Sequence, residues 1–198
     1  PAARSGTERA AEVARSRRDQ VIITVQGDEP LIEPDMVEQL AEYLGRHNAV
    51  PMASLMTGLR RAEDIDNPNV VKVVTDSDGF ALYFSRAPIP FKRANACLPR
   101  RARRRQGPTP ACRAEHGAGR GQRANHWKHL GIYGYQRHFL LRFPSLEPTT
   151  LEELEQLEQL RALEHGFRIR LLETAHDTLG VDTPDDLRRA EHVLLGVR

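Results

Sequence analysis

Hydrophobic and polar positions follow two alternating rhythms along the chain, and these predict strands and helices in turn. Short apolar runs rich in β-branched or aromatic residues indicate strands at residues 21–25, 49–55, 70–75, 80–84, 130–135 and 167–173. The first run, Val21–Val25, contains four β-branched aliphatic residues and a threonine, and Gly27 follows closely. That pattern is typical of a buried parallel strand.

Apolar residues at helical spacing predict helices at residues 6–18, 35–47, 150–165 and 184–195. The third helix is expected to open with a capping box formed by Thr150 and Glu153, and to stop at Gly166. Thr183, followed by Pro184 at the first helical position, predicts the start of the last helix. Strands that alternate with helices predict a layered α/β fold in one domain spanning residues 1–198.

Composition excludes several classes of protein. Of the 198 residues, 39% are hydrophobic and 28% are charged, which suits one globular core. No apolar run approaches the roughly 20 residues that a membrane helix needs, and the first twenty residues lack the apolar centre of a signal peptide. Two cysteines, Cys97 and Cys112, form neither a disulfide framework nor a CxxC metal motif. We expect a cytoplasmic protein that has no membrane partner.

One tract carries the excess of positive charge. Residues 93–123 hold nine arginines and a single acid, whereas the rest of the chain sums to a net charge of −6. The interval 93–126 also has hardly any large apolar residue, so we expect an irregular or disordered segment inserted in the domain, or a stretch translated in the wrong frame. An RNA- or phosphate-binding arm is the alternative, although the negative charge of the rest of the domain disfavours nucleic acid as a partner.

An acid follows the first predicted strand, in the sequence Gln26-Gly27-Asp28-Glu29-Pro30. Ligands bind at the carboxyl ends of strands in open α/β sheets, and an aspartate there suits Mg²⁺, which prefers oxygen ligands. A turn in which Asp28 merely caps the next helix is the alternative. Asp182, just before the cap at Thr183, is a second carboxylate that is surplus to helix capping. Spacing alone does not bring the two acids together.

Two glycines interrupt the predicted strand His129-Leu130-Gly131-Ile132-Tyr133-Gly134-Tyr135. Glycine weakens a strand, so we expect another group to approach this backbone closely. His129 and Tyr133 lie four residues apart and therefore on one face, where they either bind a polar ligand or form a satisfied core pair. Arg86, at the end of another predicted strand, is a natural partner for a carboxylate.

Seven motifs follow one another along the chain. They are Ser5-Gly6-Thr7-Glu8-Arg9, Val25–Pro30, Asn67-Pro68-Asn69-Val70-Val71-Lys72, Tyr83-Phe84-Ser85-Arg86-Ala87-Pro88-Ile89-Pro90, His129–Tyr135, Leu157-Glu158-Gln159-Leu160-Arg161 and Gly180-Val181-Asp182-Thr183-Pro184. With these motifs in this order, the chain closely resembles the 3-deoxy-manno-octulosonate cytidylyltransferases, or CMP-Kdo synthetases, of Gram-negative bacteria. The resemblance covers residues 5–92 and 127–195.

The resemblance implies a Rossmann-like nucleotidyltransferase fold with three α/β/α layers, Mg²⁺ dependence, a homodimer and a cytoplasmic step of lipopolysaccharide biosynthesis. The anomeric hydroxyl of the sugar acid would attack the α-phosphate of CTP. By the same resemblance, Asp28 and Asp182 are expected to be the metal carboxylates. Nucleotide contacts are expected at Ser5, Gly6 and Gln26. Contacts to the sugar acid are expected at Arg86, Gln26, His129, Tyr133, Glu158 and Gln159. Arg86 is expected to share catalysis with the two acids.

The family's first strand and its Arg/Lys/Gly-rich phosphate loop would precede Pro1. We therefore expect the chain to be an N-terminally truncated fragment that is catalytically dead or nearly so and that has poor affinity for CTP. A cytidylyltransferase for another acid sugar, such as a sialic acid, is the alternative enzyme. An inactive protein that binds nucleic acid through its arginine tract is the alternative of a different class.

Overall fold

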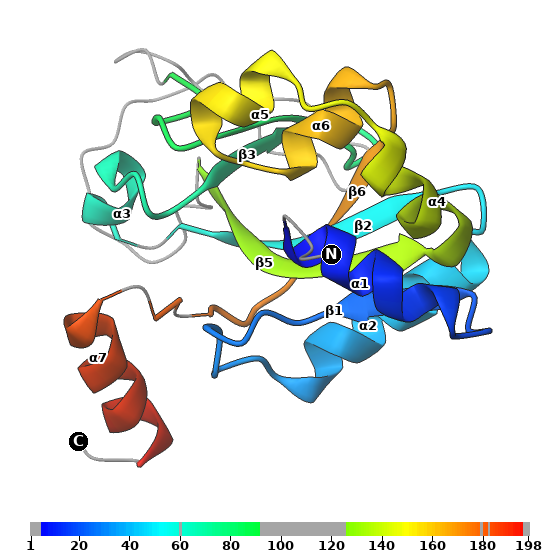
Figure 1. Cartoon of the computed structure of the whole chain (residues 1–198). Helices are drawn as coiled ribbons and strands as arrows, with labels where there is room; N and C mark the ends of the chain where they lie inside the picture. The colour runs from blue at the N-terminus through cyan, green and yellow to red at the C-terminus, as the bar shows by residue number, and fades with distance from the viewer. Residues whose placement is uncertain (1–4, 60, 92–125, 179, 182, 196–198) are drawn as a thin grey trace, which may run out of the picture.

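The computed structural model describes residues 5–59, 61–91, 126–178, 180–181 and 183–195. Its main feature is a mixed sheet of six strands with helices on both faces (Figure 1). The strands are β1 (Val21–Thr24), β2 (Met52–Gly58), β3 (Lys72–Thr75), β4 (Ala81–Ser85), β5 (Trp127–Gln136) and β6 (Ile169–Glu173). The helices are α1 (Gly6–Arg15), α2 (Pro34–Arg46), α3 (Glu63–Asp66), α4 (Arg137–Arg142), the 3-10 helix η1 (Phe143–Ser145), α5 (Thr150–Glu155), α6 (Gln159–Glu164) and α7 (Pro184–Leu194).

The long strand β5 organises the sheet, whose order is β4-β3-β5-β2-β6. The start of β5 pairs with β3 and its end pairs with β1, while β2 follows it along the other edge. All of these pairings are antiparallel, and β2 with β6 is the parallel pair. A bulge between Ser54 and Leu55 shifts the register of β2 against β5. A break of this kind re-aims side chains, and it lies beside His129 and Gly131.

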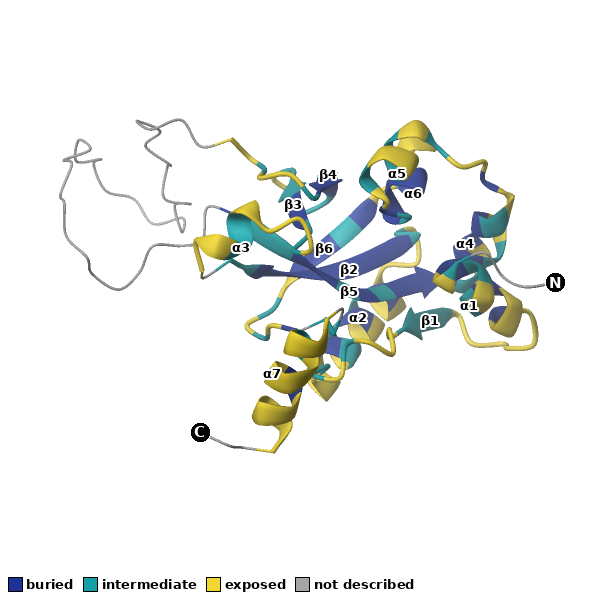
Figure 2. Cartoon of the chain, turned by 60° about the vertical axis from the view of Figure 1, so that its left-hand side comes forward, coloured by how far each residue is buried: buried dark blue, intermediate teal, exposed yellow. Residues whose placement is uncertain are grey.

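Two apolar cores confirm the predicted three layers. On one face, α2 buries Met36, Leu40 and Leu44 against the sheet. On the other face α1, α4 and α6 cover a larger core, and Figure 2 shows the strands between the layers as the most buried part of the molecule. That larger core includes Ala11, Ala14, Met52, Phe84, Tyr135, Phe139, Leu160 and Leu171. None of the described helices is long and apolar enough to cross a membrane.

The prediction of a buried parallel strand at Val21–Val25 was wrong. β1 pairs antiparallel with the end of β5, and all four of its residues are only half-buried. A run of β-branched residues indicates a strand, but it does not fix the direction of the partner.

The prediction of a single helix over 150–165 was also wrong. The chain breaks at Gln156, which adopts a left-handed conformation with φ 53°, and α6 starts three residues later. The capping box is formed by Thr149 and Glu152, one position earlier than predicted. Glu152 also forms a buried ion pair with Arg161, which fixes α5 against α6. Gly166 ends this region with φ 80°, as predicted.

The last helix begins as predicted, because Thr183 caps α7 by accepting a hydrogen bond from the N–H of Asp186, with Pro184 in the first turn. α7 lies apart from the layers in Figure 1, and Ala190 is its buried residue. Of the predicted irregular tract 93–126, all but His126 lies outside the described residues.

Candidate functional site

The loop after β1 presents Asp28 to solvent. Gln26, Gly27 and Asp28 are exposed, and the Asp28 carboxylate accepts no hydrogen bond and forms no ion pair within the described part of the chain. Helix α2 is capped at Glu33, so the alternative in which Asp28 caps the next helix is wrong. An exposed carboxylate without a protein partner is the type of oxygen ligand that Mg²⁺ uses.

The segment before α7 meets this loop through the backbone. The N–H of Val181 donates to the carbonyl oxygen of Asp28 at 2.8 Å, although the two residues are 153 positions apart. Asp182 itself lies outside the described residues. The structure therefore brings the chain next to Asp182 onto Asp28, as the metal hypothesis requires, without describing the second carboxylate.

Glu29 fastens the same loop to β5. Its Oε1 accepts a hydrogen bond from the N–H of Gly131 at 3.0 Å, and a Cβ at Gly131 would lie 2.3 Å from that oxygen. Burial raises the pKa of the Glu29 carboxyl, while hydrogen bonding and the charge of Lys128 oppose the rise. At Gly134 the close neighbour is Leu44 of α2. The approach predicted from these two glycines is confirmed, and both approaching groups belong to the chain itself.

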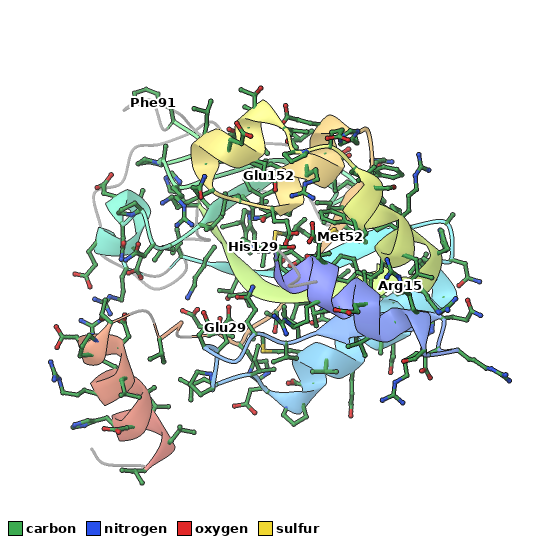
Figure 3. The ribbon with its side chains drawn as sticks, viewed as in Figure 1. Arg15, Glu29, Met52, Phe91, His129 and Glu152 are labelled. Atoms are coloured by element: carbon green, nitrogen blue, oxygen red, sulfur yellow. The ribbon has the colours of Figure 1, made fainter. Side chains whose placement is uncertain are left out.

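His129 and Tyr133 share one face of β5, as predicted, with ring centroids 5.2 Å apart. The Nε2 of His129 lies 2.9 Å from the hydroxyl oxygen of Ser54, and Phe84 packs edge-on against the imidazole (Figure 3 labels His129). Burial, together with the charge of Lys128, lowers the pKa of His129 to about 3. The imidazole is thus neutral at physiological pH and serves as a hydrogen-bonding group, not as a cation.

Tyr133 lies near charged groups from both sides of the site. Burial raises its pKa well above the ordinary value, and the neighbouring Tyr135, Glu158 and Glu29 add to the effect. The Tyr133 hydroxyl is therefore a neutral hydrogen-bonding group as well.

The connection between α5 and α6 brings Glu158 to the start of α1. Its carboxylate accepts hydrogen bonds from the hydroxyls of Ser5 and Thr7, at 2.5 and 2.7 Å. Gln159 is 5% exposed, and its Nε2 has no hydrogen-bond partner among the described residues. A buried amide without an acceptor is costly unless a ligand supplies one. A Cβ added to Gly6 would meet no atom within 4 Å, so its backbone faces open space.

Arg86 is held at the same connection, but by backbone groups. Its Nε and Nη1 donate to the carbonyl oxygens of Glu155 and Pro68 at 2.8 and 2.9 Å. The Glu155 carboxylate accepts from the backbone N–H of Arg86 and from the Ser85 hydroxyl. Within the described chain, no carboxylate forms an ion pair with the guanidinium group, and its Nη2 donates to the carbonyl oxygen of Gln156 at 3.4 Å.

Sequence reasoning missed four residues that build the site, and three of them had a weak signal. Glu29 and Thr7 lie inside motifs that were recognised, and Glu155 precedes one of them. Ser54 has no signal in the sequence, because its importance depends on the β-bulge that turns it toward His129.

The chain is similar in sequence to known cytidylyltransferases. A model of the cytidylyltransferase family matches residues 1–170. The 3-deoxy-manno-octulosonate cytidylyltransferase of Geobacter sulfurreducens is 46% identical over 185 residues, covering 93% of this chain and 68% of the relative. The protein of the same name from Syntrophotalea carbinolica is 46% identical over 193 residues, covering 98% and 70%.

The chain is also similar to solved structures of nucleotidyltransferases. A CMP:2-keto-3-deoxy-manno-octonic acid synthetase complexed with CTP superposes with a TM-score of 0.76 at 36% identity, covering 98% of this chain and 69% of that one. A putative glucose-1-phosphate thymidylyltransferase from Bacillus anthracis has a TM-score of 0.56 at 12% identity, which shows a shared fold alone. From its fold, its motifs and these matches, the chain belongs to the cytidylyltransferase family.

Proposed function

We propose that this protein transfers the CMP moiety of CTP to 3-deoxy-manno-octulosonate (Kdo), giving CMP-Kdo and pyrophosphate. The observation that carries the proposal is the 46% identity to relatives of that name over 93% or more of the chain. The range 1–170 that the family model matches includes the loop after β1, the polar face of β5 and the α5–α6 connection. These are the three segments that bring the candidate residues together.

The proposed reaction needs positioning more than covalent chemistry. The anomeric hydroxyl of Kdo forms a new P–O bond at the α-phosphorus, the bond from that phosphorus to the bridging oxygen breaks, and pyrophosphate leaves. No protein nucleophile is required, since phosphoryl and nucleotidyl transfer depend mostly on alignment and charge neutralisation.

The sugar acid would be held by neutral and charged groups together. The neutral imidazole of His129 and the hydroxyl of Tyr133 offer hydrogen bonds on one side, and the unpaired amide of Gln159 offers a donor beside Glu158. The free donors of Arg86 suit the carboxylate of the sugar acid. Ser5 and Gly6, at the start of α1, and Gln26, after β1, would contact the nucleotide.

Mg²⁺ is proposed as the metal, held by Asp28 and Asp182. The exposed, unpaired carboxylate of Asp28 fits this role, and the Val181 bond brings the chain before Asp182 to the same loop. When bound, the ion would neutralise charge on the phosphates of CTP.

The wider setting is also part of the proposal. We propose a homodimer that acts in the cytoplasm in a step of lipopolysaccharide biosynthesis. Leu82, on the edge strand β4, is 62% exposed and Phe91 is 89% exposed, which suits a surface that a second copy would cover.

The test is to incubate the chain with CTP and Mg²⁺ and either Kdo or N-acetylneuraminic acid, and to detect products by mass spectrometry, which registers low turnover. We expect CMP-Kdo from the first mixture and no CMP-sugar from the second. Product from the sialic acid alone would assign the enzyme to the alternative substrate, and nucleic-acid binding without any product would favour the non-catalytic alternative.

A further inference from the structure

The loop that carries Asp28 has few attachments of its own. Gln26, Gly27 and Asp28 are exposed, and the loop's own turn is a single weak bond from the N–H of Glu29 to the carbonyl of Gln26 at 3.3 Å. An exposed loop with so few contacts is free to sample many conformations. A metal ligand, in contrast, has to be presented in a defined place before the ion arrives.

Glu29 supplies the attachment that the loop lacks. Its side chain crosses to the middle of β5, where Oε1 accepts the N–H of Gly131 at 3.0 Å. This N–H faces the edge of β5 that β3 and β1 share, and it is available because it lies between the last contact with β3, from the N–H of His129 to the carbonyl of Val71, and the first pair with β1, Thr24 with Tyr133. Figure 3 shows Glu29 at the loop after β1, beside the sheet.

The strand is shaped to receive this carboxylate. A Cβ at position 131 would lie 2.3 Å from Oε1 and 3.3 Å from the carboxyl carbon of Glu29, so any side chain there displaces the contact. On its other side the loop is held by the bond from the N–H of Val181 to the carbonyl of Asp28. Asp28 therefore sits between two anchors, one on β5 and one on the segment before α7.

We infer that Glu29 is a positioning residue, whose carboxylate on the Gly131 amide holds the loop so that Asp28 meets the segment before α7 and faces the metal and phosphates. The inference rests on the proposed function only for the identity of what Asp28 binds. The anchoring itself is a property of the chain without ligands.

Three variants and one control separate this role from simple destabilisation. Glu29→Ala removes the acceptor, Glu29→Gln keeps an acceptor oxygen for Gly131, and Gly131→Ala pushes the carboxylate away while leaving it in the sequence. Gly134→Ala is the matched control, because the same change on the same strand meets Leu44 Cδ1 of the core at 2.6 Å and not the loop.

Two readouts are taken for each variant. Amide hydrogen exchange of Val181, compared with that of the core amide of Leu171, reports how well Asp28 is held in the absence of any ligand. Mn²⁺ binding, followed by the loss of its free electron paramagnetic resonance signal, reports the metal site without turnover. Thermal unfolding of each variant gives the stability against which both are compared.

We expect Glu29→Ala and Gly131→Ala to speed the exchange of Val181 relative to Leu171 about tenfold, and to weaken Mn²⁺ binding about tenfold, the effect of losing one good hydrogen bond. Glu29→Gln should stay within about threefold of the unmodified chain, since its amide oxygen still accepts from Gly131. Gly134→Ala should lower the unfolding temperature and change neither the exchange rate of Val181 relative to Leu171 nor the affinity for Mn²⁺.

A double-mutant cycle tests whether Glu29 and Gly131 act through the same contact. If Gly131→Ala acts by displacing Glu29, then adding it to Glu29→Ala should change nothing further. Fully additive effects, or an unchanged Val181 exchange ratio in Glu29→Ala, would overturn the positioning role. Failure of Mn²⁺ to bind the unmodified chain would count against the proposed metal site instead, while the exchange ratios would still decide the role of Glu29.

Discussion

The hydroxyl of Ser5 donates a hydrogen bond to the carboxylate of Glu158 at 2.5 Å, and these residues are 153 positions apart. The same carboxylate accepts from Thr7, so one acid ties the first turn of α1 to the α5–α6 connection. A residue expected at the nucleotide and one expected at the sugar acid are therefore a single unit. A disturbance at either substrate position should reach the other.

Glu158→Ala should lower the free energy of unfolding by about 1–3 kcal/mol, because it removes the carboxylate to which the hydroxyls of Ser5 and Thr7 donate. Urea unfolding measures this directly. Glu153→Ala is the matched control, since Glu153 is an exposed acid of α5 and should change stability by less than about 0.5 kcal/mol. Equal effects of the two substitutions would contradict the linkage.

Asp28→Asn and Asp182→Asn should each remove most Mg²⁺-dependent formation of CMP-Kdo and leave the fold intact. Asp28 is exposed and its side chain makes no hydrogen bond or ion pair in the described chain, so its loss costs little stability, while losing a metal carboxylate costs several kcal/mol of transition-state stabilisation. Product is measured at fixed Mg²⁺ by mass spectrometry, with circular dichroism to check the fold. Asp78→Asn, in the exposed turn before β4, serves as the control. Near-normal turnover in either site variant would remove that acid from the metal site.

Lys72→Met should destabilise the chain by about 2 kcal/mol or more. The ammonium of Lys72 is fully buried and donates to the carbonyl oxygens of Asn67, Val70 and Arg86 at 2.9, 2.6 and 2.5 Å. Methionine fills the space but removes the donor from the carbonyls of Val70 and Arg86, and it leaves the carbonyl of Asn67 with the N–H of Val70 alone. Guanidinium unfolding at pH 7 gives the change. A loss under about 0.5 kcal/mol would mean that these carbonyls find other donors.

The stability of the protein should fall as the pH falls from about 6.5 towards 3, partly because of His129. Burial holds the pKa of His129 at about 3 in the folded chain, against about 6.5 when unfolded. In that window the unfolded state binds a proton that the folded state does not, so acid favours unfolding by up to about 1.4 kcal/mol per pH unit. His129→Asn should reduce the slope of the unfolding free energy against pH by up to about 1.4 kcal/mol per pH unit, measured by urea unfolding between pH 4 and 7. An unchanged slope would show that His129 titrates normally in the folded protein.

The layers of the fold could be predicted from sequence because they depend on local periodicity. Val37, Leu40 and Leu44 recur at helical spacing, and α2 does turn them to the sheet. Strand direction could not be predicted, because the β-branched residues of Val21–Thr24 suit either partner. The direction of β1 depends on its partner, which is the distant end of β5.

The candidate residues could be predicted only through the resemblance to a family. Spacing along β5 predicts that His129 and Tyr133 share a face, and the structure confirms it. No pattern, however, predicts that Glu158 reaches Ser5 or that Glu29 reaches Gly131, because those contacts join segments that are over a hundred residues apart. Long-range contacts follow from the topology, which a periodic pattern does not encode.

The break between α5 and α6 gives a last prediction. Gln156 adopts φ 53° and ψ 48°, a left-handed conformation that disfavours side chains with a Cβ. Its carbonyl lies 3.4 Å from Nη2 of Arg86, and the turn leads directly to Glu158. Gln156→Gly should therefore stabilise the chain or leave it unchanged, by up to about 1 kcal/mol, whereas Gln156→Val should destabilise it, because a β-branched residue resists positive φ. Thermal unfolding of both variants measures the difference, and Glu153→Gly, within helical α5, is the control that should lose about 1 kcal/mol. If Gln156→Gly lost as much stability as the control, the residue would be helical in solution and the two helices would be one.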